Sequence, residues 1–159
     1  MAHINEREME WTELDYEEAG FRRKQLGEAA GSDLLGCSLY ELPAGNQSWP
    51  YHYHTANEEA IYVLAGAGQL HLDGETNSLQ TGDYAAFPAD ESGGHRIVND
   101  GGETLRYLTI STMNEPDITV YPDSEKLGVF VGSPPGGRDP RLLHGYYRID
   151  DDVGYWESE

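Results

Sequence analysis

Residues 45–66 read G-N-Q-S-W-P-Y-H-Y-H-T-A-N-E-E-A-I-Y-V-L-A-G. It contains His52, His54 and Glu59, three side chains of the types that bind transition metals. Residues two apart in a β-strand point to the same face, so His52 and His54 project together from an extended segment. A turn and an apolar run that ends at Gly66 follow, which indicates a second strand returning beside the first, with Glu59 level with the histidines.

Two neighbouring acids, Glu58 and Glu59, compete for the inward position at the start of this second strand. Alternation places Glu59 on the same face as Ile61 and Val63 and leaves Glu58 on the other face. The face with the branched apolar residues is the one expected in a core. We therefore choose Glu59 as the candidate ligand and interpret Glu58 as a solvated surface carboxylate.

A second stretch, residues 82–99, contains a further candidate ligand, His95. Five residues separate Gly82 from Pro88, and three residues separate His95 from Asn99. Taken with H-x-H, four residues, Glu, six residues and Gly in the first stretch, this pattern resembles the two conserved motifs of the cupin superfamily. Both motifs occur in order, and the resemblance covers roughly residues 34–112.

The resemblance implies an all-β fold, a double-stranded β-helix or jelly-roll barrel that forms a single cupin domain with N- and C-terminal extensions. It also implies one divalent transition metal, Mn, Fe, Zn or Ni. The side chains that it implies as ligands are His52, His54, Glu59 and His95.

Two departures from the family pattern concern the loops around the site. Gly45 lies one residue further from His52 than is usual, and the loop P-A-D-E-S-G-G-H carries two extra residues between Pro88 and His95. Asp90 stands where glycine is usual. The longer loop leaves two interpretations open: a lid over the site, or a lengthened turn.

The rest of the chain also shows the pattern of an all-β sandwich or barrel, with many short strands at turn spacings and almost no helical periodicity. Strands are expected at residues 34–42, 60–65, 84–87, 95–98 and 104–112, the last of which closes the barrel. The dipeptide Asp73-Gly74 predicts a hairpin.

We divide the chain into an acidic N-terminal arm (residues 1–18), the barrel (residues 19–131) and a C-terminal tail (residues 132–159). The arm is interpreted as a loosely ordered segment or an added strand. The tail is expected to dock on the barrel or on a partner subunit, because aromatic side chains are costly to leave in water. Its aromatic residues are Tyr146, Tyr147, Tyr155 and Trp156.

The charge of the chain limits its partners. Its 159 residues include ten basic and 29 acidic ones, which gives a net charge of −19. Such a field repels nucleic acid and anionic membranes, so neither is expected as a partner. The acids are scattered and lysine is scarce, which favours a solvated, halophilic surface over an acidic patch for a basic partner. No apolar stretch reaches membrane-spanning length and no signal-peptide pattern opens the chain, so a cytoplasmic protein is expected.

Two local features stand apart from the motifs. Arg22, Arg23 and Lys24 form the only basic cluster, which is interpreted by default as a solvated strand face. Pairing across a subunit interface and clamping of an anionic ligand are the alternatives. Cys37 is the single cysteine, so it cannot form an intramolecular disulfide, and we expect it to pack as a small core residue.

Two functions fit such a site if it holds a metal, and a metal-free structural barrel is the third possibility. The first, which the resemblance favours, is a metal-dependent enzyme of the oxygenase, decarboxylase or isomerase type that acts on a small organic substrate. The second is a non-catalytic small-molecule or sugar-binding module in which the metal is structural or orients the ligand. The candidates for orienting a substrate are Tyr107, Arg106, Tyr62 and Arg96, of which alternation turns Tyr62 and Arg96 outward. The resemblance also implies a homodimer.

Overall fold

The computed structural model describes residues 3–16 and 19–158, and β-strands dominate them. Their order is β1 (Thr12–Tyr16), β2 (Ala19–Gln25), β3 (Leu35–Leu42), β4 (Tyr53–His54), β5 (Glu59–Ala65), β6 (Ala67–Leu72), β7 (Glu75–Gln80), β8 (Tyr84–Phe87), β9 (His95–Val98), β10 (Leu105–Thr112), β11 (Asp117–Tyr121), β12 (Lys126–Val131) and β13 (Leu143–Arg148). Helical structure in the described residues is limited to one short α-helix and four 3₁₀ turns: α1 (Leu26–Ala30), η1 (Glu6–Glu8), η2 (Glu91–Gly93), η3 (Pro122–Ser124) and η4 (Ile149–Asp151). The all-β prediction is confirmed.

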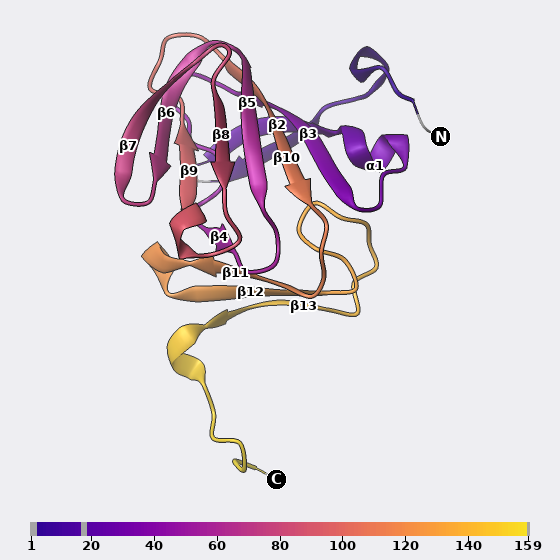
Figure 1. Cartoon of the computed structure of the whole chain (residues 1–159), viewed down its shortest axis with the longest axis vertical. Helices are drawn as coiled ribbons and strands as arrows, with labels where there is room; N and C mark the ends of the chain where they lie inside the picture. Colours follow the sequence, from indigo (N-terminus) through magenta and orange to yellow (C-terminus); the bar gives the residue numbers. More distant parts are fainter. Residues whose placement is uncertain (1–2, 17–18, 159) are drawn as a thin grey trace.

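The strands form two layers, and in Figure 1 β11, β12 and β13 run across one end of the barrel. One is a six-stranded sheet in the order β1-β2-β3-β10-β5-β8. The other consists of a four-stranded sheet, β13-β12-β11-β4, and a three-stranded sheet, β7-β6-β9. Isolated antiparallel bridges from Gln47 to Val98 and from His52 to His95 join these two smaller sheets. The result is the predicted jelly-roll barrel, with the histidine segment at the seam between the two smaller sheets.

The barrel interior is filled by the inward residues of alternating strands. In β5, Ile61 and Val63 are almost fully buried, whereas Tyr62 between them is 41% exposed. This alternation confirms the face chosen for Glu59. Leu42 of β3 and Leu105 of β10 are completely buried in the same core. Burial of such side chains is the main favourable contribution to folding.

The run that is expected to close the barrel is β10. It lies inside the six-stranded sheet, paired with β3 on one side and β5 on the other. A central strand has both backbone edges satisfied, so a long uninterrupted run suits the middle of a sheet better than its edge.

Two of the turns occur at glycine residues that the sequence pattern marked. Asp73 and Gly74, at the end of the β6–β7 hairpin, have φ angles of 48° and 76°, the left-handed values that a two-residue hairpin turn requires. Gly66 has a φ of 83°, and a Cβ at this position would lie 2.6 Å from the carbonyl oxygen of Thr104. Only glycine satisfies both conditions, which explains the residue that ends the first motif.

The two extensions behave differently. In the arm, β1 pairs with β2, so this segment is an added strand. In the tail, β13 pairs with β12, but beyond Arg148 the chain leaves the barrel (Figure 1), and Tyr155 and Trp156 are 86% and 80% exposed. Among residues 3–16 and 19–158, no helix has the length and apolar character needed to cross a bilayer.

Candidate metal centre

Three of the side chains proposed from the sequence surround a carboxylate oxygen of the fourth, Glu59. Glu59 Oε2 lies 4.0 Å from His52 Nε2, 3.4 Å from His54 Nε2 and 3.5 Å from His95 Nε2. The ligand atoms of His52, His54 and Glu59 all lie within 4.8 Å of one another, as a shared metal ion requires. All three histidines are buried, with exposed fractions of 8% or less.

Three separate passes of the backbone deliver these side chains. His54 lies in β4, and the backbone of His52 just before it exchanges two hydrogen bonds with that of His95 at the start of β9. Glu59 opens β5 after the turn that follows β4. Asn57 fixes this turn, because its buried side chain bonds to both Asn114 and Thr112. The site is therefore supported by strands rather than by mobile loop tips.

Each histidine is oriented through its other ring nitrogen. Nδ1 of His52 donates to the carbonyl oxygen of Pro50 at 2.8 Å, and Nδ1 of His95 donates to that of Gly93 at 2.9 Å. Nδ1 of His54 donates to Asp117 Oδ2 at 2.6 Å. With Nδ1 acting as the donor, Nε2 of the neutral ring carries a free lone pair directed at the site. This donor set and its outer acceptors are those of a metal-binding histidine cluster, so the residues present fit a divalent ion.

Asp117 is the functional residue that the sequence motifs missed. It is fully buried, and besides holding His54 it accepts a hydrogen bond from the backbone N–H of Ala56 at 3.1 Å. Thr119, two residues further along β11, also lies 3.2 Å from His54 Nδ1. The available signal was an acid at an inward position of an apolar strand, D-I-T-V-Y, where alternation places Asp117 and Thr119 on one face.

The lengthened loop before His95 is a compact turn. Its extra residues form η2, which Asp90 caps by accepting a hydrogen bond from the backbone N–H of Ser92. Asp90 has extended backbone angles, so the position does not need the usual glycine. Gly93 is buried, and its carbonyl oxygen is the acceptor for His95 Nδ1. Of the two interpretations left open, the lengthened turn is the one observed.

The electrostatics of the cluster favour a positive charge at its centre. Burial lowers the pKa of His52 to about 3, aided by its histidine neighbours, and burial also lowers the pKa of His95. For His54, burial acts in the same direction, but hydrogen bonds to Asp117 and Glu59 outweigh it and raise the pKa to about 10. Burial alone would raise the pKa of Glu59, yet the contact with His54 holds it at about 2. In the metal-free site, His54 is therefore protonated and pairs with the ionised Glu59. A metal ion would take the place of the proton on Nε2 of His54.

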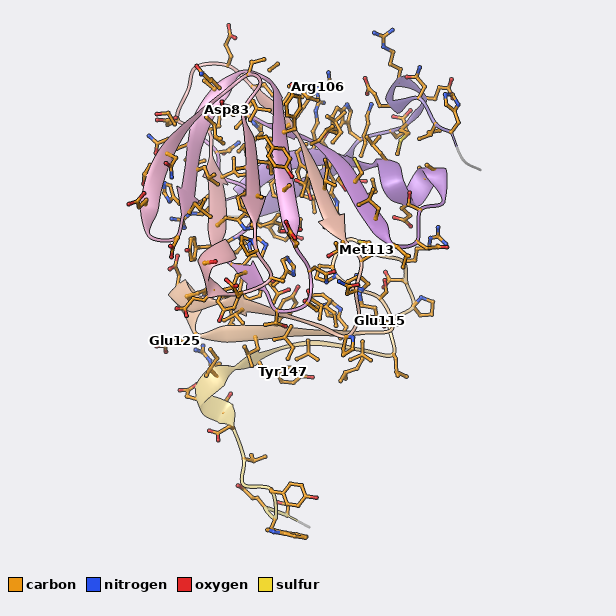
Figure 2. All side chains as sticks on the ribbon, viewed as in Figure 1. Asp83, Arg106, Met113, Glu115, Glu125 and Tyr147 are labelled. Atoms are coloured by element: carbon orange, nitrogen blue, oxygen red, sulfur yellow. The ribbon has the colours of Figure 1, made fainter. Side chains whose placement is uncertain are left out.

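A cavity of about 680 Å³ opens from this cluster. Tyr107, Tyr121 and Ile61 line it near the histidines, and the segment 132–141 lines its far end. Figure 2 shows Met113 and Glu115, two further lining residues, beside that segment. Cys37 is only half-buried and forms part of the cavity wall rather than the core, and burial raises the pKa of its thiol. A cavity of this size accommodates a small organic molecule.

The four residues proposed to orient a substrate differ in whether they line the cavity. Tyr107 is buried and lines the cavity. Arg106 faces outward and pairs with Glu6 and Glu41, and Figure 2 places it far from Met113 and Glu115. Tyr62 and Arg96 do not line the cavity, in agreement with their predicted outward positions. Tyr121, which the sequence did not suggest, lies in the cavity with its ring stacked on His52 at a centroid distance of 5.9 Å.

The basic cluster divides between the two faces of β2. Arg22 pairs with Glu41 at 2.6 Å, and Lys24 pairs with Glu6 at 2.9 Å, both on the outer face. Arg23 lies between them on the inner face and lines the cavity. The default interpretation of one solvated face therefore does not describe all three residues.

Comparison with known proteins agrees with this geometry. The family model described as the cupin domain matches residues 38–111. Among solved structures, a protein from Acidithiobacillus ferrooxidans, provisionally assigned as a sugar phosphate isomerase, aligns over 93% of this chain and 90% of its own with 28% identity and a TM-score of 0.77. A cupin-superfamily sugar phosphate isomerase from Silicibacter pomeroyi aligns over 94% of both chains with 25% identity and a TM-score of 0.77.

Similarity to curated protein sequences is more local. Protein SchB of Streptomyces halstedii is 39% identical over 57 residues, which are 36% of this chain and 40% of SchB. The chain therefore matches less than half of the length of that relative.

Proposed function

The chain carries a cupin domain, and from this premise we propose that it is an enzyme that depends on one divalent transition metal held by His52, His54, Glu59 and His95. The observation that carries the proposal is the arrangement of the three imidazoles. Each Nδ1 is bonded to an outer acceptor, and each Nε2 faces the same carboxylate oxygen. Mixed nitrogen and oxygen donors of this kind suit Mn, Fe, Zn and Ni.

Open space beside the ligands favours an enzyme over a purely structural metal site. A closed structural site surrounds its ion with protein ligands, whereas the cluster here lines a cavity of about 680 Å³. When bound in such a site, a divalent metal polarises a carbonyl oxygen or lowers the pKa of bound water.

Of the possible reaction types, we favour isomerisation of a sugar phosphate. Two solved structures that align over at least 90% of both chains are named as sugar phosphate isomerases, one of them provisionally. Isomerisation of this kind moves a proton between neighbouring carbons and needs a site that excludes bulk water. Burial raises the pKa of Tyr121, so its phenol stays a neutral hydrogen-bond donor beside the ligand His52. We assign Tyr121 to hold a substrate oxygen.

The test is solvent exchange followed by proton NMR. The full chain is supplied in turn with Mn²⁺, Fe²⁺, Zn²⁺ or Ni²⁺ and incubated with pentose and hexose phosphates in D₂O. We expect the C2 proton of an aldose phosphate to be replaced by deuterium, the matching ketose phosphate to appear, and EDTA to stop both. Metal-loaded protein that leaves every sugar phosphate unchanged would refute the isomerase and support the non-catalytic binding module.

A further inference from the structure

We propose that Arg23 binds the anionic head group of the substrate, a phosphate monoester or a carboxylate, at the far end of the cavity, with Arg138 as a second cationic contact. The residues around this position form a recess of about 460 Å³. They are Arg23, Gln25, Glu28, Gly136, Gly137, Arg138, Asp139 and Arg141, and all except Glu28 come from the inner face of β2 or from the segment 132–141. The identity of the substrate rests on the proposed function, whereas the site itself does not.

Arg23 is placed inward by strand alternation. Phe21, two residues earlier in β2, is 3% exposed in the core, and Arg23 follows it on the same face. Its guanidinium carbon lies 5.7 Å from the ring centroid of Trp49, another residue of the cavity wall. A planar guanidinium stacked near an aromatic ring keeps its N–H edge available for an anion.

The guanidinium of Arg23 lacks the partners that its neighbours have. Its Nε is buried without a hydrogen-bond partner. In residues 3–16 and 19–158, no carboxylate oxygen lies within 4.0 Å of it, although Arg22 and Lys24 on either side are both paired. A cation that is partly withdrawn from water and unpaired is costly, and an anionic ligand offsets that cost.

The other two arginines of the recess, Arg141 and Arg138, differ in their contacts. Arg141 makes its polar contacts within its own segment, residues 132–141. It donates hydrogen bonds to the carbonyl oxygens of Ser133 and Pro134 at 3.0 and 3.1 Å. It also pairs with Asp139 at 3.3 Å. Arg138 pairs with Asp33 at 3.7 Å and donates a long hydrogen bond to the carbonyl oxygen of Ser32 at 3.5 Å, and the side chains of Arg138 and Asp33 are more than half exposed. Such an exposed pair is weak and is easily exchanged for a phosphate or carboxylate. Arg138 is therefore free to join Arg23, and Arg141 shapes the segment.

The distribution of charge supports a recognition site. The whole chain carries a net charge of −19 and only ten basic residues, so its overall field opposes an anionic substrate. Three of those ten meet at this recess. Two acids also line it, Glu28 and Asp139, but Asp139 is already paired with Arg141. Guanidinium groups bind phosphate and carboxylate through two parallel hydrogen bonds, which makes arginine the suitable residue here.

The experiment is calorimetric titration of the full chain with inorganic phosphate and with acetate, before and after metal removal by EDTA. We expect Arg23→Gln to weaken anion binding by about tenfold or more, through loss of a charge-assisted pair of hydrogen bonds. Arg23→Lys keeps the positive charge but loses the planar guanidinium. Its anion affinity should lie between those of the wild type and Arg23→Gln. Arg22→Gln is the matched control, because it removes the same charge from the outer face of the same strand.

The outcomes separate the possible head groups and separate this site from the metal centre. Tighter binding of phosphate than of acetate identifies a phosphate head group, and the reverse identifies a carboxylate. Anion binding by the wild type that persists after EDTA treatment belongs to the recess and stands even if no sugar phosphate is isomerised. Before EDTA treatment, Arg23→Gln should contain as much metal as the wild type, which shows that the substitution leaves the metal centre intact. Equal anion affinities for wild type, Arg23→Gln and Arg23→Lys would overturn the proposal.

Discussion

The ring nitrogen that faces away from the centre decides what each imidazole can do. His52 and His95 are held by carbonyl oxygens two residues away, whereas His54 is held by Asp117, which is 63 residues further along the chain. Alternation and the family motifs suggested His52, His54, Glu59 and His95, and the imidazole Nε2 atoms of the three histidines lie within 4.0 Å of Glu59 Oε2. They did not reveal Asp117, because no local spacing relates an acid in β11 to a histidine in β4.

Replacing Asp117 with Asn is expected to weaken metal retention by about 10- to 100-fold, because the neutral amide no longer orients and polarises His54. Metal content after dialysis against a graded series of chelator concentrations measures this. Asp123→Asn is the control, since Asp123 is an exposed acid just beyond β11. Equal retention by Asp117→Asn and wild type would show that Asp117 has no part in the site.

At the scale of elements, the strands were more predictable than the loops that connect them. The alternation of β5 and the hairpin between β6 and β7 follow directly from the sequence, because inward residues and turn residues have local signatures. The central place of β10 and the shape of the loop before His95 do not, since both depend on which distant segments pack against them. Sequence alone could not choose between a lid and a turn for that loop.

The loop that carries His95 should tolerate no side chain at Gly93. A Cβ there would lie 2.0 Å from the backbone oxygen of Pro88, so Gly93→Ala must move the loop. We expect a loss of about 1–3 kcal/mol in the free energy of unfolding, as in other overpacked sites, together with weaker metal retention. Gly102→Ala is the control, because a Cβ there meets no atom within 4 Å. Urea unfolding that gives the same stability for both variants would contradict this description of the loop.

The attachment of the N-terminal arm to the barrel should depend on pH. The hydrogen bond from Lys24, assisted by Arg106, lowers the pKa of Glu6 below its ordinary value of 4.5. A carboxyl whose folded-state pKa is depressed stabilises the fold above pH 4.5, and this contribution is lost as the pH falls through the folded-state value.

Glu6→Gln should therefore be less stable than wild type near neutral pH, and the difference should shrink under acidic conditions. Urea unfolding of the metal-free proteins at several pH values measures it. Glu8→Gln changes an exposed acid of the same turn and should show no such trend. A difference between Glu6→Gln and wild type that is constant with pH would mean that the ion pair does not hold the arm.

At the scale of the whole molecule, the exposed aromatic side chains of the C-terminal tail are the feature that most clearly indicates a protein interface. Tyr147 lies on the side of β13 away from the barrel, as Figure 2 shows, and is 50% exposed. Tyr155 and Trp156 are more exposed still. Exposed aromatic groups of this kind are typical of interfaces, so we expect a second copy of the chain to cover them, although the homodimer stays a prediction.

The double substitution Tyr155→Ser and Trp156→Ser is expected to convert a dimer into a monomer, because it removes the largest exposed apolar groups of the tail. Light scattering during gel filtration gives the mass. Tyr84→Ser is the control, since Tyr84 is 64% exposed on β8, far from the tail in Figure 1. A full chain that is already monomeric, or a double variant that remains dimeric, would remove the tail from the interface.

We propose that one metal ion is bound by three imidazoles and a carboxylate inside the barrel. Elemental analysis of protein purified without added metal and without a nickel column tests it most directly. We predict close to one transition-metal ion per chain for the wild type and for Glu58→Gln, and none for the double variant His54→Ala, Glu59→Gln. Metal retained at the wild-type level by a folded double variant would contradict the account.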